Sequence, residues 1–254
     1  MCADTFSAQI GIQLIDAVME TKLLDFNLDK SCYMVIGEEC AQNDIRKQFQ
    51  ETPLTLSGVV MKEVNEEKYL GDYISAGGLD KSTIVTIERR YNKVVNALAE
   101  IRAVVEDCRS HITGGIKTGL EIWEMAVMPY LLNNCETWCD IPPKALKLLD
   151  KLQKQFLRNL LATPFTCPTP SLMWETGTTT MENKILKKKL IFHYHLLHLP
   201  QDSLAWQVMQ TQTNLELPGL TQEFKKMIKE LELPQAQMYT KCQWKNLVNK
   251  KIKE

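Results

Sequence analysis

Apolar side chains recur at every third or fourth position along residues 80–105, DKSTIVTIERRYNKVVNALAEIRAVV, and this spacing decides the fold class. The repeating positions are Ile84, Ile87, Tyr91, Val94, Leu98, Ile101 and Val105. A stripe of this period and length predicts one long helix that packs against other helices. Asp80 or Ser82 can cap its start, and Gly77-Gly78 and Gly114-Gly115 bound it on either side.

The chain after this segment also predicts helices. The expected helical ranges are 120–133, 145–161 and 182–197, followed by less clearly patterned segments near 201–212, 221–231 and 243–251. Residues 120–133 are apolar nearly all round, so we expect this helix to be the most buried. Pro142-Pro143 precede the next helix, and prolines at 164, 168 and 170 are expected to stop it.

Before Gly77 the pattern changes to one helix followed by short strands. Residues 7–24 predict an amphipathic helix whose buried face holds Ala8, Ile12, Ile15, Met19 and Leu23. Runs of β-branched and aromatic residues predict strands at 32–36, 54–56, 59–64 and 69–74, with a turn at Asn65-Glu66-Glu67 and a loop with about one helical turn over 38–52. The expected class is therefore α+β, mainly α, with short antiparallel strands.

Composition narrows the class of protein further. The 254 residues are 44% hydrophobic and 7% aromatic, which is typical of a globular protein. The longest apolar stretch, 122–132, contains Glu124 and is too short to cross a membrane. Because the N-terminus shows no secretory signal, we expect an intracellular protein, in the nucleus or the cytoplasm, with its 8 cysteines reduced.

No set of residues suggests a metal site. Cys135 and Cys139 would share a helix face but have no two further ligands nearby in the sequence. His193, His195 and His198 are close in sequence, but no Cys, Asp or Glu is placed to complete a site with them. We therefore expect no metal ligands and interpret these histidines as structural or surface residues.

The net charge of −1 conceals an asymmetry between the halves of the chain. Residues 1–127 carry 13 Lys+Arg against 20 Asp+Glu, a net −7, whereas residues 128–254 carry 17 against 11, a net +6. The C-terminal half is therefore the candidate for binding a polyanion.

The helix expected at 145–161 has two distinct faces. One face is apolar, with Ala145, Leu149, Leu152, Phe156 and Leu160, and the other is basic. The basic stripe consists of Lys144, Lys147, Lys151, Lys154 and Arg158, opposed by Asp150. The stripe could follow a nucleic-acid backbone or could be a solvated helix face; five cations against one acid favour binding. A second, weaker candidate is the cluster of Lys184, Lys187, Lys188 and Lys189.

Two segments carry a resemblance to a known family. They are Leu28-Asp29-Lys30-Ser31-Cys32-Tyr33-Met34-Val35-Ile36-Gly37 and Lys68-Tyr69-Leu70-Gly71-Asp72-Tyr73-Ile74-Ser75. Together they resemble the end of the palm domain of LINE-like reverse transcriptases, from non-LTR retrotransposons. The likeness continues through Cys135-Glu136-Thr137-Trp138 and the segment 170–177. It implies a partial palm with a primer-grip-like hairpin at 1–76, a helical thumb at 77–165 and a helical C-terminal extension at 166–254.

The resemblance also implies roles for individual residues. Lys30 would be the palm lysine that approaches the leaving pyrophosphate, although a surface lysine at the start of a strand would look the same. Tyr69, Leu70 and Gly71 would form the primer-grip turn, where glycine lets backbone amides approach a phosphate closely. A tight hairpin with Tyr69 and Leu70 packed inward is the plain alternative.

The family signature of an aromatic residue, any residue and two aspartates would lie immediately before Met1, so the resemblance implies that no catalytic carboxylates are present. Two-metal phosphoryl transfer needs such carboxylates, and Mg²⁺ is expected only in the complete parent enzyme. We therefore expect a fragment of an RNA-directed DNA polymerase that is inactive alone and binds RNA or an RNA–DNA duplex. The alternative is a domesticated or decayed fragment that acts as a helical scaffold, with the missing polymerase portion or another protein as its partner.

Overall fold

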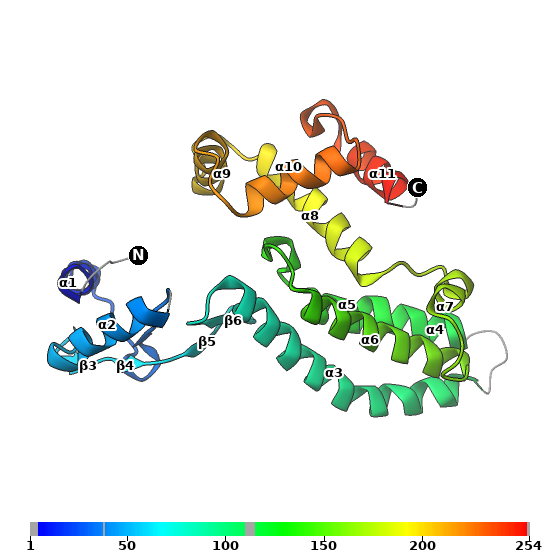
Figure 1. Ribbon diagram of the computed structural model, residues 1–254, viewed down its shortest axis with the longest axis horizontal. Coiled ribbons are helices and arrows are strands. Elements are labelled where there is room, and N and C mark those ends of the chain that lie inside the picture. The colour runs from blue at the N-terminus through cyan, green and yellow to red at the C-terminus, as the bar shows by residue number, and fades with distance from the viewer. Residues whose placement is uncertain (1–4, 38, 110–114, 253–254) are drawn as a thin grey trace. The chain divides into compact units, whose positions relative to one another are not determined.

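The computed structural model describes residues 5–37, 39–109 and 115–252 (Figure 1). The chain divides into two compact units, Met1–Ser82 and Thr83–Glu254, called unit 1 and unit 2 below. The strands of the described residues all belong to unit 1, and unit 2 is helical. The predicted α+β, mainly α class is confirmed. The division falls at Ser82, inside the helix that begins at Leu79.

Unit 1 combines two helices with short strands. Its elements are α1 (Thr5–Thr21), the 3-10 turn η1 (Leu28–Lys30), β1 (Cys32–Tyr33), α2 (Glu39–Glu51), β2 (Thr55–Leu56), β3 (Val59–Val60), β4 (Lys62–Glu63), β5 (Glu66–Tyr69) and β6 (Asp72–Ser75). The strands form three separate pairs, of which β2–β3 and β5–β6 are antiparallel. The pair β1–β4 is parallel, so the prediction of antiparallel strands was wrong there. Parallel strands need a long connection, because the chain must return to the end at which the first strand began. Here α2, β2 and β3 lie between β1 and β4.

Residues Glu39–Glu51 form a full helix, where the sequence predicted a loop with about one helical turn. The prediction was wrong because the segment is rich in Gln, Glu, Arg and Lys, which form helices well but leave only a sparse apolar stripe. Ile45 and Phe49 are four residues apart and share a face of α2. Phe49 packs edge-on against Tyr33, with 4.9 Å between the ring centroids, so α2 is held against β1.

The last two strands are joined at Leu70-Gly71, within the hairpin expected at Tyr69–Gly71, whereas the turn predicted at Asn65-Glu66-Glu67 is wrong. Glu66 and Glu67 belong to β5, and Tyr69 pairs with Asp72, so the turn consists of Leu70 and Gly71. Both turn residues have positive φ, +48° and +94°, which is the conformation of a two-residue type I′ hairpin turn. Glycine tolerates this backbone better than other residues, which explains Gly71 at the second position.

Helix α1 has apolar side chains on two of its faces, but only one of these faces is buried. Ala8, Ile12 and Met19 are half-buried where α1 packs against α2 and β2. Ile15 is exposed, and Leu23, which follows the end of α1, is 94% exposed, so the prediction of one buried face was wrong for these two residues. The exposed apolar face of α1 consists of Phe6, Ile10, Leu14, Ile15 and Val18.

Unit 2 contains a helix at each predicted place. The elements are α3 (Leu79–Arg109, which starts in unit 1), α4 (Gly115–Ile122), the π-helical turn η2 (Trp123–Val127), α5 (Met128–Leu131), η3 (Cys135–Thr137), α6 (Pro143–Leu161), α7 (Thr169–Thr176), α8 (Met181–Leu197), α9 (Leu204–Asn214), α10 (Leu220–Glu230), η4 (Ala236–Met238) and α11 (Lys241–Lys251). The helix predicted at 120–133 is thus interrupted by a π-helical turn. Helix α7 was not predicted.

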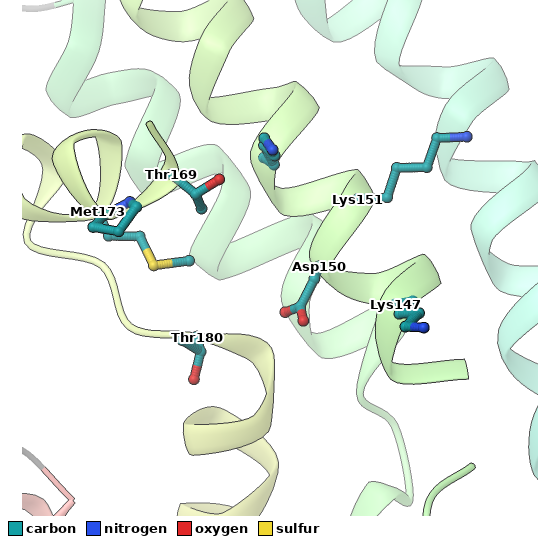
Figure 2. A pocket seen from close by; sticks show the side chains of 8 residues that line it. Lys147, Asp150, Lys151, Thr169, Met173 and Thr180 are labelled. Carbon is teal, nitrogen blue, oxygen red and sulfur yellow. The ribbon is translucent and has the colours of Figure 1, made fainter. Parts of the chain in front are cut away.

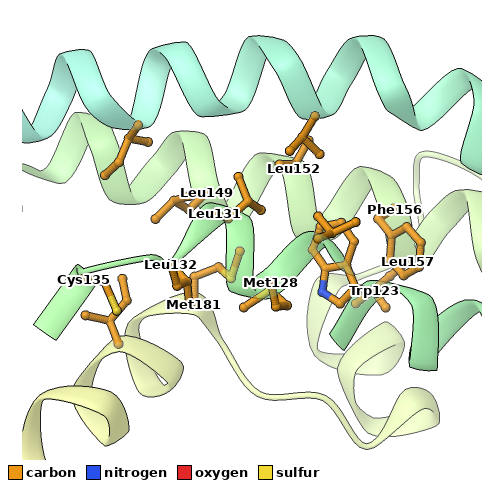
Figure 3. Packing of buried hydrophobic residues seen from close by; sticks show 14 of the residues in the cluster. Trp123, Met128, Leu131, Leu132, Cys135, Leu149, Leu152, Phe156, Leu157 and Met181 are labelled. Carbon is orange, nitrogen blue, oxygen red and sulfur yellow. The ribbon is translucent and has the colours of Figure 1, made fainter. Parts of the chain in front are cut away.

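The first core of unit 2 lies between α3, α5 and α6 and includes η2, α7 and the start of α8 (Figure 3). The predicted apolar face of α6 is buried as expected: Ala145, Leu149, Leu152, Phe156 and Leu160 are at most 3% exposed. The rings of Trp123 and Phe156 stack at 4.2 Å between centroids. The position of α6 is therefore fixed from one side, and its opposite side is free to carry charge.

A second core lies around the C-terminal half of α8. It packs Leu190, Tyr194 and Leu196 of α8 against residues of α9, α10 and α11. Trp244 of α11 is fully buried, and its Nε1 donates a hydrogen bond to the Leu190 carbonyl at 3.0 Å. Helix α8 contributes to both cores, because Met181 and Ile185 at its start belong to the first.

Cations hold the turn that follows α5, where the Cys135–Trp138 block lies. Buried Arg90 donates hydrogen bonds to the Leu131 and Asn133 carbonyls, and its guanidinium lies 5.7 Å from the centre of the Trp138 ring. Lys188 donates to the Leu132 carbonyl at 2.9 Å. Positive charge is favourable at the C-terminal end of a helix, where backbone carbonyls lack partners. The Cys135–Trp138 block therefore lies in a turn that Arg90 and Lys188 stabilise by packing and by capping the end of α5.

Candidate nucleic-acid interface

The basic stripe lies along the side of α6 that faces away from the first core. Lys147 and Lys151 are exposed, and Lys154 is half-buried. Among the interactions of the described residues, none pairs these three ammonium groups with an acid. Three cations at consecutive helical turns are thus available to an external anion.

The two ends of the stripe have partners inside the protein. Lys144 forms an ion pair with Glu88 of α3, at 2.7 Å between Nζ and Oε1. Arg158 donates hydrogen bonds to the Phe165 and Cys167 carbonyls, and its guanidinium lies 5.6 Å from the centre of the Phe165 ring. Arg158 therefore holds the loop after α6. The central lysines, Lys147, Lys151 and Lys154, are called the α6 lysines below.

A hollow of about 490 Å³ lies beside the α6 lysines (Figure 2). Thr169, Pro170 and Met173 of α7 line its other side, together with Thr180 at the start of α8. Figure 2 shows the Asp150 carboxyl between α6 and Thr180. The hollow thus combines a cationic side with an apolar and hydroxyl-bearing side.

Asp150 connects α6 to the start of α8. Its carboxylate accepts a hydrogen bond from the Met181 backbone N–H, while its Oδ1 atom is buried without a partner. Burial raises the pKa of Asp150, and the Met181 hydrogen bond opposes this shift. Next to it, Gln153 donates to the Thr179 carbonyl at 2.8 Å. The two side chains fix the segment that joins α7 to α8.

The second predicted lysine cluster is largely engaged within the protein. Lys184 pairs with Glu124, and Lys188 caps the turn after α5. Lys189 is 2% exposed and bonds to Glu223 and to the Trp138 carbonyl. Lys187 is half-buried and lines a separate hollow with Glu124 and Thr178. The structure therefore does not bring Lys187 and Lys188 together with the α6 lysines into one described hollow.

The primer-grip-like residues lie at the tip of the β5–β6 hairpin in unit 1. Tyr69 and Leu70 are 63% and 76% exposed, so they do not pack inward as the plain alternative required. The strand β5 is exposed along its whole length. Lys30 ends η1 and is also exposed, and its backbone N–H is capped by the Asn27 side chain at 3.2 Å.

The histidine cluster is divided among different surroundings. His193 packs against Phe224 at 4.6 Å between ring centroids, and burial lowers its pKa to about 4. His198 stacks on Tyr194, and His195 is exposed. Within the described ranges, no group of three His, Cys, Asp or Glu side chains is placed to hold a metal ion.

Two aromatic residues between the end of α6 and the end of α7 are exposed. Trp174 on α7 is 89% exposed and Phe165 in the loop after α6 is 88% exposed. From the sequence each tryptophan could stack on a base or anchor the core, and the core was favoured; Trp123, Trp138 and Trp244 are indeed buried. The signal that could have identified Trp174 is the spacing from Leu172, because a residue two positions from a buried one points to the opposite side of a helix.

Comparison with protein-family models, curated proteins and solved structures finds no significant match for this chain. Among the described residues, no helix has the length and apolar character needed to cross a membrane.

Proposed function

We propose that unit 2 binds RNA or an RNA–DNA duplex through the α6 lysines, as a thumb-like module of a LINE-like reverse transcriptase. The observation that carries the proposal is the arrangement of Lys147, Lys151 and Lys154 on a helix whose opposite face is fixed in the core. A rigid row of unpaired cations contacts successive phosphates and releases their counterions.

The charge of the two units supports the same function. Residues 83–254 carry 23 Lys+Arg against 17 Asp+Glu, a net +6, whereas residues 1–82 carry 7 against 14, a net −7. A polyanion is therefore attracted to unit 2 and repelled by most of unit 1. In unit 1 the exposed hairpin tip at Tyr69–Gly71 would reach the primer backbone, as the family resemblance implies.

The first test is a binding titration of the full chain with an RNA–DNA duplex at two salt concentrations. We expect binding with little base preference and an affinity that falls steeply as salt rises, because the contacts are to phosphates. Absent binding at low salt, or binding that is insensitive to salt, would refute the proposed function.

We also expect the 254-residue chain by itself to show no templated nucleotide incorporation with Mg²⁺ or Mn²⁺. Its sequence contains no adjacent pair of aspartates to clamp two metal ions. A primer-extension assay with a no-protein control measures this. Metal-dependent products above that control would contradict the expectation and leave the duplex-binding proposal standing.

One observation favours the second candidate, a protein-interaction scaffold. The exposed apolar face of α1 contains five large apolar side chains. Contiguous apolar patches on a protein surface often mark a site of protein–protein interaction. Under this proposal the partner would be the remaining polymerase portion or another protein. An absence of duplex binding in a folded chain would favour the scaffold.

A further inference from the structure

Trp174 differs from the other tryptophans in its surroundings. Trp123, Trp138 and Trp244 are buried and Trp206 is half-buried, whereas Trp174 is almost fully exposed on α7. Single exposed apolar side chains are common on protein surfaces, so the indole is informative only together with the charged groups near it.

Helix α7 presents this indole from a fixed position. Leu172 on the opposite side is buried in the first core, and the Gly177 N–H caps the helix end by donating to the Trp174 carbonyl at 3.2 Å. Trp174 is four residues from Pro170, which lines the hollow, so the two residues lie on the same side of α7. Trp174 is therefore one helical turn from a residue that lines the hollow, although the indole is not itself part of the lining, and the α6 lysines line the other side.

Basic groups beside an exposed aromatic ring fit one class of ligand best. A single nucleic-acid strand presents phosphates for the lysines and unpaired bases whose faces stack on aromatic rings. A duplex offers only phosphates to such a surface, because its bases are already stacked. An apolar peptide would leave the α6 lysines without partners.

The two sides of the hollow differ in charge. The α6 side carries the three lysines together with the Asp150 carboxyl, whereas the α7 side carries Pro170 and Met173. Phosphates are attracted to the lysines, and an unpaired base of the same strand is left to contact the apolar α7 side. A base stacked on Trp174 would lie on the α7 side while the phosphates of the same strand contact the α6 lysines.

We propose that Trp174 stacks on an unpaired base of single-stranded RNA or DNA whose phosphates bind Lys147, Lys151 and Lys154. This inference rests on the proposed function and extends it, because it gives the surface a strand end or overhang as ligand in addition to a duplex. Base stacking is tolerant of sequence, so little discrimination between bases is expected.

The test compares two ligands of equal charge: a 12-nucleotide oligothymidine and an abasic oligonucleotide of the same length. We expect the full chain to bind oligothymidine about tenfold more tightly. Trp174→Ala should lower the oligothymidine affinity to the abasic level without changing the abasic affinity, and Trp174→Phe should restore most of the preference. Leu204→Ala, at a similarly exposed apolar position on α9, is the matched control and should change neither affinity.

The outcomes separate this inference from the proposed function. Equal affinity of the unaltered chain for both oligonucleotides, or an equal loss for both in Trp174→Ala, overturns the stacking inference alone. No binding of either ligand at low salt overturns the proposed function, and the stacking inference with it. A thermal melt shows that each variant is folded.

Discussion

Replacing Lys147, Lys151 and Lys154 together by glutamine is expected to reduce duplex affinity on the order of a hundredfold at about 0.15 M salt. Each lost phosphate contact removes about one unit from the slope of log affinity against log salt, so the slope should fall by about three. Glutamine forms helices nearly as well as lysine, and the positions lie outside the core. The thermal melt should therefore change little.

A matched control removes the same charge elsewhere in unit 2. Lys225, Lys226 and Lys229 are exposed on α10, and their replacement by glutamine lowers the net charge equally. We expect the control to lose much less affinity than the α6 variant, because contacts and not net charge determine binding. Equal losses in the two variants would argue that the α6 lysines are an ordinary solvated surface.

Removal of the acid that pairs with Lys189 is expected to have the largest effect on stability. Glu223→Ala should destabilise unit 2 by about 3–5 kcal/mol, because it leaves a buried ammonium without its counterion. Lys189 is 2% exposed, and its Nζ lies 2.5 Å from Glu223 Oε1. Denaturant unfolding followed by tryptophan fluorescence measures the change in the free energy of unfolding.

The double variant Lys189→Met with Glu223→Leu provides the control for that measurement. It removes both charges and fills the site with apolar side chains of similar volume, so stability should return close to that of the unaltered chain. A double variant as unstable as Glu223→Ala would show that the loss comes from packing and not from the unpaired charge.

The sequence predicted the helices whose apolar stripes are long and regular. The stripe of α3 and the two faces of α6 follow one helical period over many residues, so local pattern and tertiary packing agree. Helix α7 was missed because Pro168 and Pro170 were interpreted as stops. In the structure Pro168 is the N-cap of α7 and Pro170 lies in its first turn, where a proline costs no hydrogen bond.

The candidate site could be predicted only in part. The five cations of the stripe were visible from their spacing, but their partners were not, because Glu88 lies 56 residues from Lys144 in the sequence. The carbonyls held by Arg158 belong to an irregular loop that has no periodic signal. The five cations of the stripe are therefore of two kinds: three lysines with no acid partner among the described residues, and two cations, Lys144 and Arg158, that bind groups of the protein itself.

Helix α8 contributes side chains to both cores, so its length sets the distance between them. Its 17 residues span about 26 Å at about 1.5 Å per residue. Thr180, at the edge of the hollow, and His198, beside Tyr194 in the second core, cap its two ends. The distance between the hollow and the second core is thus set by the length of one helix. A bend in α8 between Ile185 and Leu190 would therefore change the distance between the hollow and the second core.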